Sequence, residues 1–356
     1  MNQTLRLERR ALKLAASAAL AAAFLTACGG GELAGRSAGT AIAPSFRRAG
    51  PMPPAQPLGT HRSWMSPAAL KTGKLLYVSG AATNTVYVYT YKTHVLVGEL
   101  RGIRQPSGEC VDKKGDVWIT SWQEMTVTEY PHGGSVPIAT LTTPRAMQAG
   151  CSIDPTTGNL AVTTAVGTLD VWQNARGTPT NYASQLCPVL WAPGYDRNGN
   201  LYVEANAAGA GDFVCELPHG ANALRIVSFD RPIFYAASVM WDGKFITFAD
   251  QDFNAQNVSG IYQATEDASG NLTLAGSTAL VDSCGNNTDV VQPFVVGTKN
   301  TPANTTQGTA AIGSNNACLS RFDVWPYPGG GRPSDILKPP DDVPMGAAVS
   351  IRRLTR

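Results

Sequence analysis

Short runs of alternating apolar and polar residues cover most of the chain from about residue 71 onward. Val117–Thr120 and Leu201–Glu204 are two examples, and polar loops with Gly, Pro, Asn and Asp separate such runs. A period of two residues is typical of strands buried on one face, and Gly or Pro between the runs marks turns. The 36 glycines, the 24 prolines and a charged fraction of only 15% also disfavour a helical bundle. The pattern therefore predicts an all-β domain.

One motif recurs within this pattern: an aspartate, a glycine within the next four residues, and then an apolar strand. The copies are "DKKGDVWIT" from Asp112, "DPTTGNLAVTT" from Asp154, "DRNGNLYVEA" from Asp196 and "DGKFITFA" from Asp242. "KTGKLLYVSG" carries the same glycine and strand before the first copy. The glycines of these segments, Gly73, Gly115, Gly158, Gly199 and Gly243, are 42, 43, 41 and 44 residues apart. A period of this length, with several short strands in each period, predicts the blades of a β-propeller.

Six such units account for residues 75 to 351. A first unit at 75–100 lacks a proline-led inner strand, and full units follow at 106–141, 147–186, 190–229, 236–280 and 289–337. Pro344–Ile351, "PMGAAVSI", is a proline-led strand with no unit behind it. Pairing it with the first unit would close the ring and remove free sheet edges. We therefore predict a six-bladed β-propeller with four-stranded blades, closed by the C-terminal strand.

The repeated string P-x-G-x-x-V-D-x-x-G-[ND]-x-[YW]-[IV] resembles the NHL-type propeller repeat, and more loosely the gluconolactonase-like and streptogramin-lyase propellers. "LLYVSGAATNTVYVYTY", "CVDKKGDVWIT", "DPTTGNLAVT" and "GYDRNGNLYVE" are also similar to a group of bacterial exported proteins of unassigned function. The resemblance covers about residues 64–351. It implies the fold rather than an activity, because the repeated residues are those that build a blade.

The N-terminus predicts export. Four basic residues precede Ala15–Leu25, an apolar stretch too short to span a bilayer stably. The stretch runs into Leu25-Thr26-Ala27-Cys28, which resembles the lipobox of bacterial lipoprotein signal peptides. In that class the cysteine is diacylated and becomes the first residue, so Cys28 would anchor the chain to a membrane. An ordinary secretory signal with a chance cysteine is the alternative.

The predicted organisation follows from this signal. Residues 1–27 form the signal peptide, 28–70 a flexible tether rich in Gly, Ala, Ser and Pro, and 71–353 the propeller. Gly29 stands where an inner-membrane retention signal usually carries Asp, so the expected location is the cell envelope, at the outer membrane.

Six cysteines remain after Cys28, an even number that predicts three disulfides in an exported chain, although fifteen pairings are open. Cys187 and Cys284 lie in the links that enter the units holding Cys215 and Cys318, so the two pairs occupy equivalent places. We predict Cys187–Cys215 and Cys284–Cys318, which leaves Cys110–Cys151 between neighbouring inner strands. Metal binding is disfavoured because no two cysteines have C-x-x-C spacing.

The charge of the chain limits its partners. Cleavage before Cys28 would remove four basic residues and one acidic residue from a chain of net charge +2, leaving about −1. A nearly neutral protein lacks the basic surface that nucleic acids require. We expect a monomer whose partners are the membrane, through the lipid, and a glycan, peptide or protein ligand.

Ligands of such propellers bind over the central channel, on the face that carries the links between blades and the loops between second and third strands (the link face). The candidate binding residues there are Glu109, Trp122, Gln123, Glu124, Gln148, Trp191, Glu204, Asn206 and Tyr235. Polar and aromatic side chains of this kind would suit a sugar or a peptide. The alternative is that they are ordinary solvated loop residues.

One segment could bind a divalent cation. In "DQDFNAQN", Asp250, Asp252 and Asn254 match the first three ligand positions of a calcium loop. Ala255 and Ile261 replace the glycine and bidentate glutamate of an EF-hand, so only a looser Ca²⁺ site, or one for another divalent cation, is predicted.

The resemblance leaves an enzyme as the alternative to a binding module. Gluconolactonase-like enzymes hold a divalent ion on the axis with Glu, Asn and Asp, which here could only be Glu109 or Glu204, Asn206 and Asp250. The local sequences do not match that family's motifs, so no catalytic residue is assigned. No Ser-His-Asp or Cys-His set is discernible. A purely structural envelope protein is a third possibility.

Asp112 and Asp116 frame Gly115 and could be read as a pair of catalytic carboxylates. In the other copies of the motif Asn159 and Asn200 take the place of Asp116. The position therefore needs a short polar side chain after a glycine with positive φ, as a hairpin does. We interpret both aspartates as turn residues, and Glu109 remains the unexplained acid of this stretch.

Overall fold

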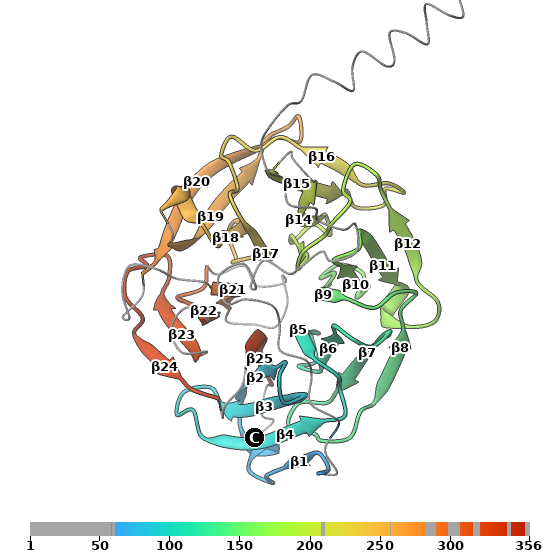
Figure 1. Cartoon of the computed structure of the whole chain (residues 1–356), viewed down its shortest axis with the longest axis vertical. Coiled ribbons are helices and arrows are strands. Elements are labelled where there is room, and N and C mark those ends of the chain that lie inside the picture. The colour runs from blue at the N-terminus through green and yellow to red at the C-terminus, as the bar shows by residue number, and fades with distance from the viewer. Residues whose placement is uncertain are drawn as a thin grey trace, which may run out of the picture. The chain divides into compact units, whose positions relative to one another are not determined.

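The computed structural model describes residues 58, 61–207, 211–256, 258–281, 290–297, 307–315, 321–339 and 343–352. The predicted signal peptide, Cys28 and most of the tether lie outside these residues, as do Cys284 and Cys318. The described residues form six antiparallel sheets arranged as blades around a central axis (Figure 1). The predicted six-bladed, all-β propeller is confirmed.

The first blade has five strands in the order β1-β4-β3-β2-β25. They are β1 (Trp64–Met65), β2 (Lys74–Gly80), β3 (Thr85–Thr90), β4 (Leu96–Arg101) and β25 (Pro344–Ile351). The C-terminal strand β25 pairs antiparallel with β2 from Lys74↔Ile351 to Gly80↔Pro344. This pairing closes the ring as predicted and leaves the inner edge of the first blade no longer free.

The first strand, β1, lies before the predicted start of the domain at residue 71. β1 lies within the predicted tether and pairs with β4, the otherwise free outer strand. Met65 packs against the hydrophobic cluster between the first two blades. Ser63 adds a hydrogen bond from Arg101 N to its Oγ at 2.8 Å. Backbone pairing and apolar packing therefore order residues that composition alone assigned to the tether.

The other five blades each have four strands, the first of which lies at the axis. The second and third blades are β5 (Pro106–Val111), β6 (Val117–Ser121), β7 (Thr126–Tyr130), β8 (Ala139–Thr142) and β9 (Gln148–Ile153), β10 (Leu160–Thr164), β11 (Thr168–Trp172), β12 (Thr180–Ala183). The fourth and fifth are β13 (Gly194–Tyr195), β14 (Leu201–Ala207), β15 (Gly211–Leu217), β16 (Arg225–Val227) and β17 (Ala236–Trp241), β18 (Ile246–Asp250), β19 (Ser259–Glu266), β20 (Leu272–Leu280). The sixth is β21 (Val290–Val296), β22 (Ala310–Asn315), β23 (Arg321–Pro326) and β24 (Asp335–Leu337).

Helical structure in the described residues is limited to three 3₁₀ segments, η1 (Ala69–Lys71), η2 (Gln173–Ala175) and η3 (Phe253–Ala255). No helix in this part of the chain is long and apolar enough to cross a bilayer.

The recurring aspartate motif forms the hairpin between the first and second strands of a blade. Asp112 Oδ1 accepts the backbone N–H groups of Lys114 at 2.8 Å and Asp116 at 2.9 Å, and Gly115 has φ +96°. Asp196 plays the same part in the fourth blade. Asp112 and Asp116 are turn residues as predicted, because the side chain caps the turn and the glycine takes a conformation that other residues rarely adopt.

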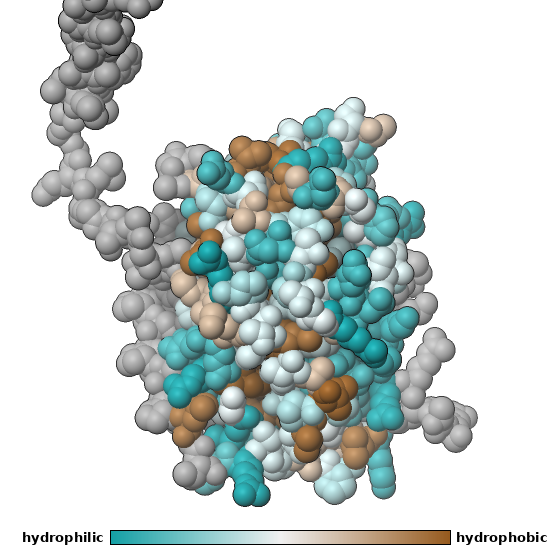
Figure 2. All heavy atoms as spheres, turned by 90° about the vertical axis from the view of Figure 1, so that its right-hand side faces the viewer, coloured by the Kyte–Doolittle hydropathy of each residue, from teal (hydrophilic) through white to brown (hydrophobic). Residues whose placement is uncertain are grey.

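The hydrophobic core lies between the blades rather than inside a single sheet. Trp118 is 1% exposed and packs in a cluster with Cys151, Leu160 and Trp172 of the third blade. Similar clusters fill the other junctions between blades. On the outer face seen in Figure 2, apolar and polar side chains are interspersed. The second strands β6, β10 and β18 are buried on both faces, which accounts for their apolar character.

Two of the three predicted disulfides are confirmed, and the third lies outside the described residues. Cys110 on β5 bonds to Cys151 on β9 with a Cα–Cα distance of 5.6 Å, which joins two neighbouring inner strands. Cys187, in the link before the fourth blade, bonds to Cys215 on β15 with a Cα–Cα distance of 6.6 Å. Disulfides indicate an oxidising, extracytoplasmic compartment.

Candidate functional site

Three carboxylates meet at the junction of the fourth and fifth blades, on the link face. Glu204, Asp212 and Asp250 together accept hydrogen bonds from four consecutive backbone N–H groups, those of residues 234–237. The donor–acceptor pairs are Phe234 N to Asp250 Oδ2 (3.0 Å), Tyr235 N to Asp250 Oδ1 (2.9 Å), Ala236 N to Asp212 Oδ2 (2.5 Å) and Ala237 N to Glu204 Oε2 (2.8 Å). The three carboxylates thus accept the backbone N–H groups of the link that leads into the fifth blade.

Burial changes the acidity of this cluster. Desolvation raises the pKa of Glu204 well above its usual value, and the nearby carboxylates of Asp250 and Asp212 raise it further. Desolvation also raises the pKa of Asp250, to about 6, although three backbone N–H groups oppose the shift. Glu204 Oε1 is buried without a partner among the described residues. A neutral Glu204 is the form that this environment favours.

Gln148 and Trp191, two further candidates, are buried. Gln148 Nε2 donates to Glu124 O and to Thr143 Oγ1, both at 3.0 Å, and its Oε1 accepts Ser121 N at 3.2 Å. Trp191 is 7% exposed and belongs to the buried cluster at the link-face end of the axis. Both side chains connect blades and neither faces solvent.

The remaining link-face candidates are more open. Trp122 and Tyr235 are half-buried, Gln123 is exposed, and Glu124 lies 3.9 Å from Arg104 Nε. Asn206 is half-buried and donates a hydrogen bond from Nδ2 to Asp212. The predicted set therefore divides into buried residues that join neighbouring blades and a few residues at the surface.

In the predicted calcium loop, the first aspartate, Asp250, binds backbone N–H groups. Asp250 accepts the Asp252 N–H at 2.9 Å in addition to the two amides from the link, and Asn254, with φ +55°, accepts a hydrogen bond from Tyr262 at 3.4 Å. A cation at this loop would share Asp250 oxygens that are already engaged, and the site remains a prediction.

Glu109 lies elsewhere from the other acids. It is on β5 and faces the first blade, where its Oε1 accepts a hydrogen bond from Ser79 Oγ. Glu204 and Asp250 belong to the fourth and fifth blades. Among the described residues, the sole group of three or more His, Cys, Asp or Glu side chains close enough to share a metal ion is Asp112, Asp116 and Glu129. Glu109 therefore does not join Glu204 and Asp250 in an axial metal site of the kind that the gluconolactonase resemblance implies.

A central cavity lies on the axis of the ring. It is in the half opposite the link face, beside the turns that join first and second strands (the turn face). It has a volume of about 140 Å³, and the inner strands of all six blades contribute to its wall. Among the predicted binding residues only Glu109 lines it, and the Cys110–Cys151 disulfide is also part of the wall. Aromatic and aliphatic side chains make up much of the remainder, namely Val111, Ile153, Tyr195, Trp241, Phe294 and Val349.

The link-face end of this cavity is closed by packed side chains. Gln292 of the sixth blade donates from Nε2 to Ala149 O of the third blade at 2.6 Å, so its side chain crosses the axis. A Cβ at Gly108 would lie 3.0 Å from Gln292 Oε1, so the glycine is needed for this close approach. Trp191 and Met345 belong to one hydrophobic cluster, whose other members extend between the fourth and fifth blades. The sequence placed Gln292 in a link on this face but assigned it no role, because no local motif marks a side chain that bonds across the ring.

Glu109 is the ionisable group at the inner end of the cavity. Burial raises its pKa from 4.5 to about 8, although the Ser79 hydroxyl opposes the shift. Its Oε2 atom is buried and has no hydrogen-bond partner among the described residues. A Cβ at Gly346 would lie 2.6 Å from this oxygen, so the glycine of β25 leaves space for the carboxyl group.

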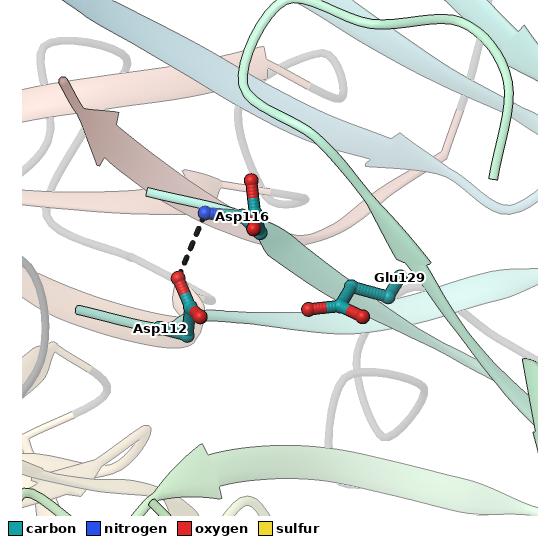
Figure 3. A group of neighbouring side chains, drawn as sticks. All are labelled: Asp112, Asp116 and Glu129. Atoms are coloured by element: carbon teal, nitrogen blue, oxygen red, sulfur yellow. Dashed lines mark hydrogen bonds between the residues drawn. The ribbon is translucent and has the colours of Figure 1, made fainter. Parts of the chain in front are cut away.

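A second acidic group lies on the turn face of the second blade (Figure 3), where Asp112, Asp116 and Glu129 offer oxygens within 4.8 Å of one another. Desolvation, followed by repulsion from Asp116 and Asp112, raises the pKa of Glu129 to about 7. The repeated motif predicts the two aspartates as turn residues but does not mark Glu129. Strand pairing places Glu129 opposite Trp118. Asp112 caps its own turn, so this carboxylate has a structural explanation.

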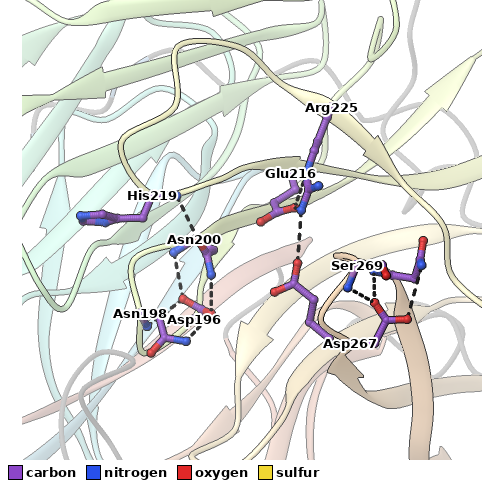
Figure 4. A network of polar contacts seen from close by, with 10 residues as sticks. Asp196, Asn198, Asn200, Glu216, His219, Arg225, Asp267 and Ser269 are labelled. Carbon is purple, nitrogen blue, oxygen red and sulfur yellow. Dashed lines mark hydrogen bonds and ion pairs between the residues drawn. The ribbon is translucent and has the colours of Figure 1, made fainter.

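Turn-face residues of the fourth and fifth blades form a polar network (Figure 4). Asp196 caps its turn through Asn198 and Asn200, and Asn200 Oδ1 accepts the His219 N–H at 3.0 Å. Arg225 lies 2.6 Å from Glu216 of its own blade and 3.3 Å from Glu266 of the next. His219 thus takes part through its backbone, and the network joins blades without converging on a cavity.

Comparison with known proteins supports the fold. No protein-family model matches the sequence, and no curated protein matches it. A chain of the nidogen/laminin complex is 13% identical, with a TM-score of 0.58 over 79% of this chain and 100% of that one. A protein of unknown function from Bacteroides caccae is 14% identical, with a TM-score of 0.57 over 79% and 100%. The β-propeller domain of Cps50 (Swd1) from Myceliophteria thermophila is 11% identical, with a TM-score of 0.51 over 80% and 88%. At these identities the likeness concerns the fold alone.

Proposed function

We propose that this protein is a lipid-anchored binding module of the bacterial cell envelope, held at the outer membrane through Cys28. The observation that supports binding is the axial cavity, which is walled by all six blades and closed at its link-face end. The two disulfides fit an exported chain, and the lipobox-like segment supplies the anchor.

The loops of the link face provide a second surface for a glycan, peptide or protein ligand. Loops on a rigid scaffold are where propellers and similar folds carry binding residues. Four large apolar side chains are exposed there, Met125 (52%), Val166 (44%), Leu186 (58%) and Phe234 (42%). Exposed apolar residues beside polar ones are typical of interaction sites.

A metal-dependent hydrolase or lyase is not favoured. That activity would need Glu109 or Glu204 beside Asn206 and Asp250 with oxygens free for a metal. Glu109 lies against the first blade. Glu204 and Asp250 do meet at the junction of the fourth and fifth blades, but there they accept backbone N–H groups, and Asn206 donates to Asp212. Metal analysis of the protein purified without chelators distinguishes the two functions. A binding module should carry no stoichiometric metal, whereas one bound divalent ion per chain would support the enzyme.

The anchor is tested on the full chain expressed in a Gram-negative bacterium. We expect labelled palmitate to be incorporated, the mature N-terminal peptide to begin at a diacylated Cys28, and the protein to fractionate with the outer membrane. The Cys28→Ser chain should lose the label and leave the membrane fraction. An unlabelled wild-type chain in the soluble fraction would contradict the proposed location.

A further inference from the structure

We propose that the central cavity binds a neutral molecule of about single-ring size, and that an oxygen atom of this ligand accepts a hydrogen bond from Glu109. The inference rests on the proposed binding function and specifies a ligand class for one of its sites.

The size of the cavity limits the ligand. Its volume of about 140 Å³ is close to that of an engineered cavity of about 150 Å³ that takes up benzene. Trp241 and Phe294 in the wall are half-buried, so each ring retains some surface that a ligand could cover. A saccharide chain or a peptide is too large for this space, whereas one substituted ring fits.

The lining determines the polarity of the ligand. Glu109 is the one Asp, Glu, Lys, Arg or His residue among the described residues that line the cavity. Most other lining groups are apolar, and the polar ones have partners: Ser238 Oγ donates to Pro293 O at 2.8 Å and Ser152 Oγ accepts Tyr195 N at 3.1 Å. A charged ligand would lose its hydration here with no more than one compensating group, so a neutral molecule is favoured.

Glu109 Oε2 has no hydrogen-bond partner among the described residues, and this atom determines where the polar atom of the ligand lies. Ser79 occupies Oε1, and the proton that the raised pKa retains near neutral pH has no acceptor on Oε2 among the described residues. A buried polar atom without a partner is costly, and native proteins commonly satisfy such atoms with a water or a ligand. Glu109 lines the cavity, so an acceptor held in the cavity would lie beside this side chain. A carbonyl or hydroxyl oxygen on the ligand would supply it.

The test measures binding of three fluorinated probes to the full chain carrying Cys28→Ser by ¹⁹F NMR. 4-Fluoroacetophenone has a carbonyl acceptor, 4-fluorotoluene has none, and 4-fluorobenzylammonium is a cation. At pH 6.5 we expect the ketone to bind roughly threefold to tenfold more tightly than the toluene, the ratio given by one net hydrogen bond. The cation should bind least.

A pH series separates hydrogen bonding from simple uptake into an apolar space. Ketone affinity should fall above pH 8 toward that of the toluene, since ionisation of Glu109 removes the donor. Glu109→Gln keeps a donor that does not ionise, so its ketone affinity should be flat with pH. Ile351→Trp, at a half-buried position in the wall, should abolish uptake of all probes with unchanged circular dichroism.

Several outcomes would overturn the proposal. Equal affinity for ketone and toluene, or a pH-independent wild type, would mean that Glu109 does not donate to the ligand. Tightest binding by the cation would replace the neutral ligand with an amine. No uptake of any probe would mean that water alone occupies the cavity, and the anchored protein could still bind ligands on its link face. Conversely, failure of palmitate labelling would refute the envelope anchor without affecting the cavity.

Discussion

Replacing Glu109 by Gln should change how the stability of the propeller depends on pH. Burial raises the pKa of this carboxyl from 4.5 to about 8. The folded protein therefore holds the proton more tightly than the unfolded chain between these two values. The free energy of unfolding should be unaffected below pH 4.5, fall as the pH rises through this window, and reach its full loss above pH 8.

The magnitude follows from the size of the shift. Each pKa unit corresponds to about 1.4 kcal/mol, so a shift from 4.5 to about 8 removes about 5 kcal/mol at high pH and roughly 3 kcal/mol at pH 7. A typical domain has a total stability of about 5–15 kcal/mol, so the effect should be readily measurable. Gln can still accept the Ser79 hydrogen bond and cannot ionise, so the variant lacks this loss.

The measurement is urea unfolding of wild type and Glu109→Gln at pH 5, 7 and 9 with the disulfides intact. The variant should match the wild type at pH 5 within about 1 kcal/mol and exceed it increasingly toward pH 9. Glu124→Gln, on a link-face loop, controls for the removal of one carboxyl group. Parallel stability profiles for wild type and Glu109→Gln would refute the reasoning, since they would mean that Glu109 has the same pKa in both states.

Three further predictions concern the frame of the propeller. Removal of the Cys110–Cys151 bond by two Ser substitutions should lower the free energy of unfolding by about 4 kcal/mol, because the unfolded chain regains the entropy that closing a loop of 41 residues had removed. Calorimetry under non-reducing conditions checks this. A loss below about 1 kcal/mol would contradict it. Asp250→Ala should lower the free energy of unfolding by about 3 kcal/mol and speed hydrogen exchange at residues 234 and 235, because their N–H groups lose their acceptor. Unchanged exchange would mean that Asp250 does not fix this link. Deletion of residues 344–356 should expose β2 as a free edge and cause association detectable by light scattering, whereas a monomeric truncated chain would show that ring closure is dispensable.

The roles of the acidic residues divide between those the sequence explains and those it does not. Asp112 and Asp116 are explained by repetition, because the turn recurs with Asn in place of the second carboxylate. Glu204 and Asp250 are not, since their partners are backbone amides of residues 234–237 in a link between blades. The sequence placed Asp212 in a link-face loop but assigned it no role, because its local sequence has no distinguishing feature. Its function depends on a contact with Ala236, 24 residues along the chain.

By itself the sequence determined the number of blades, their strands, the ring closure and the two described disulfides. These follow from local rules that repeat about every 42 residues: alternation sets the strands, and an aspartate with a glycine sets the turns. It also singled out Glu109 as an acid that no turn explains. The tertiary structure decided that Glu109 lines a cavity in the turn-face half of the ring. It also decided that Gln292 crosses the other half to bond with Ala149, 143 residues away. The physical reason is that burial and hydrogen-bond partners at the axis are set by where six blades meet, and no single segment of sequence contains that information.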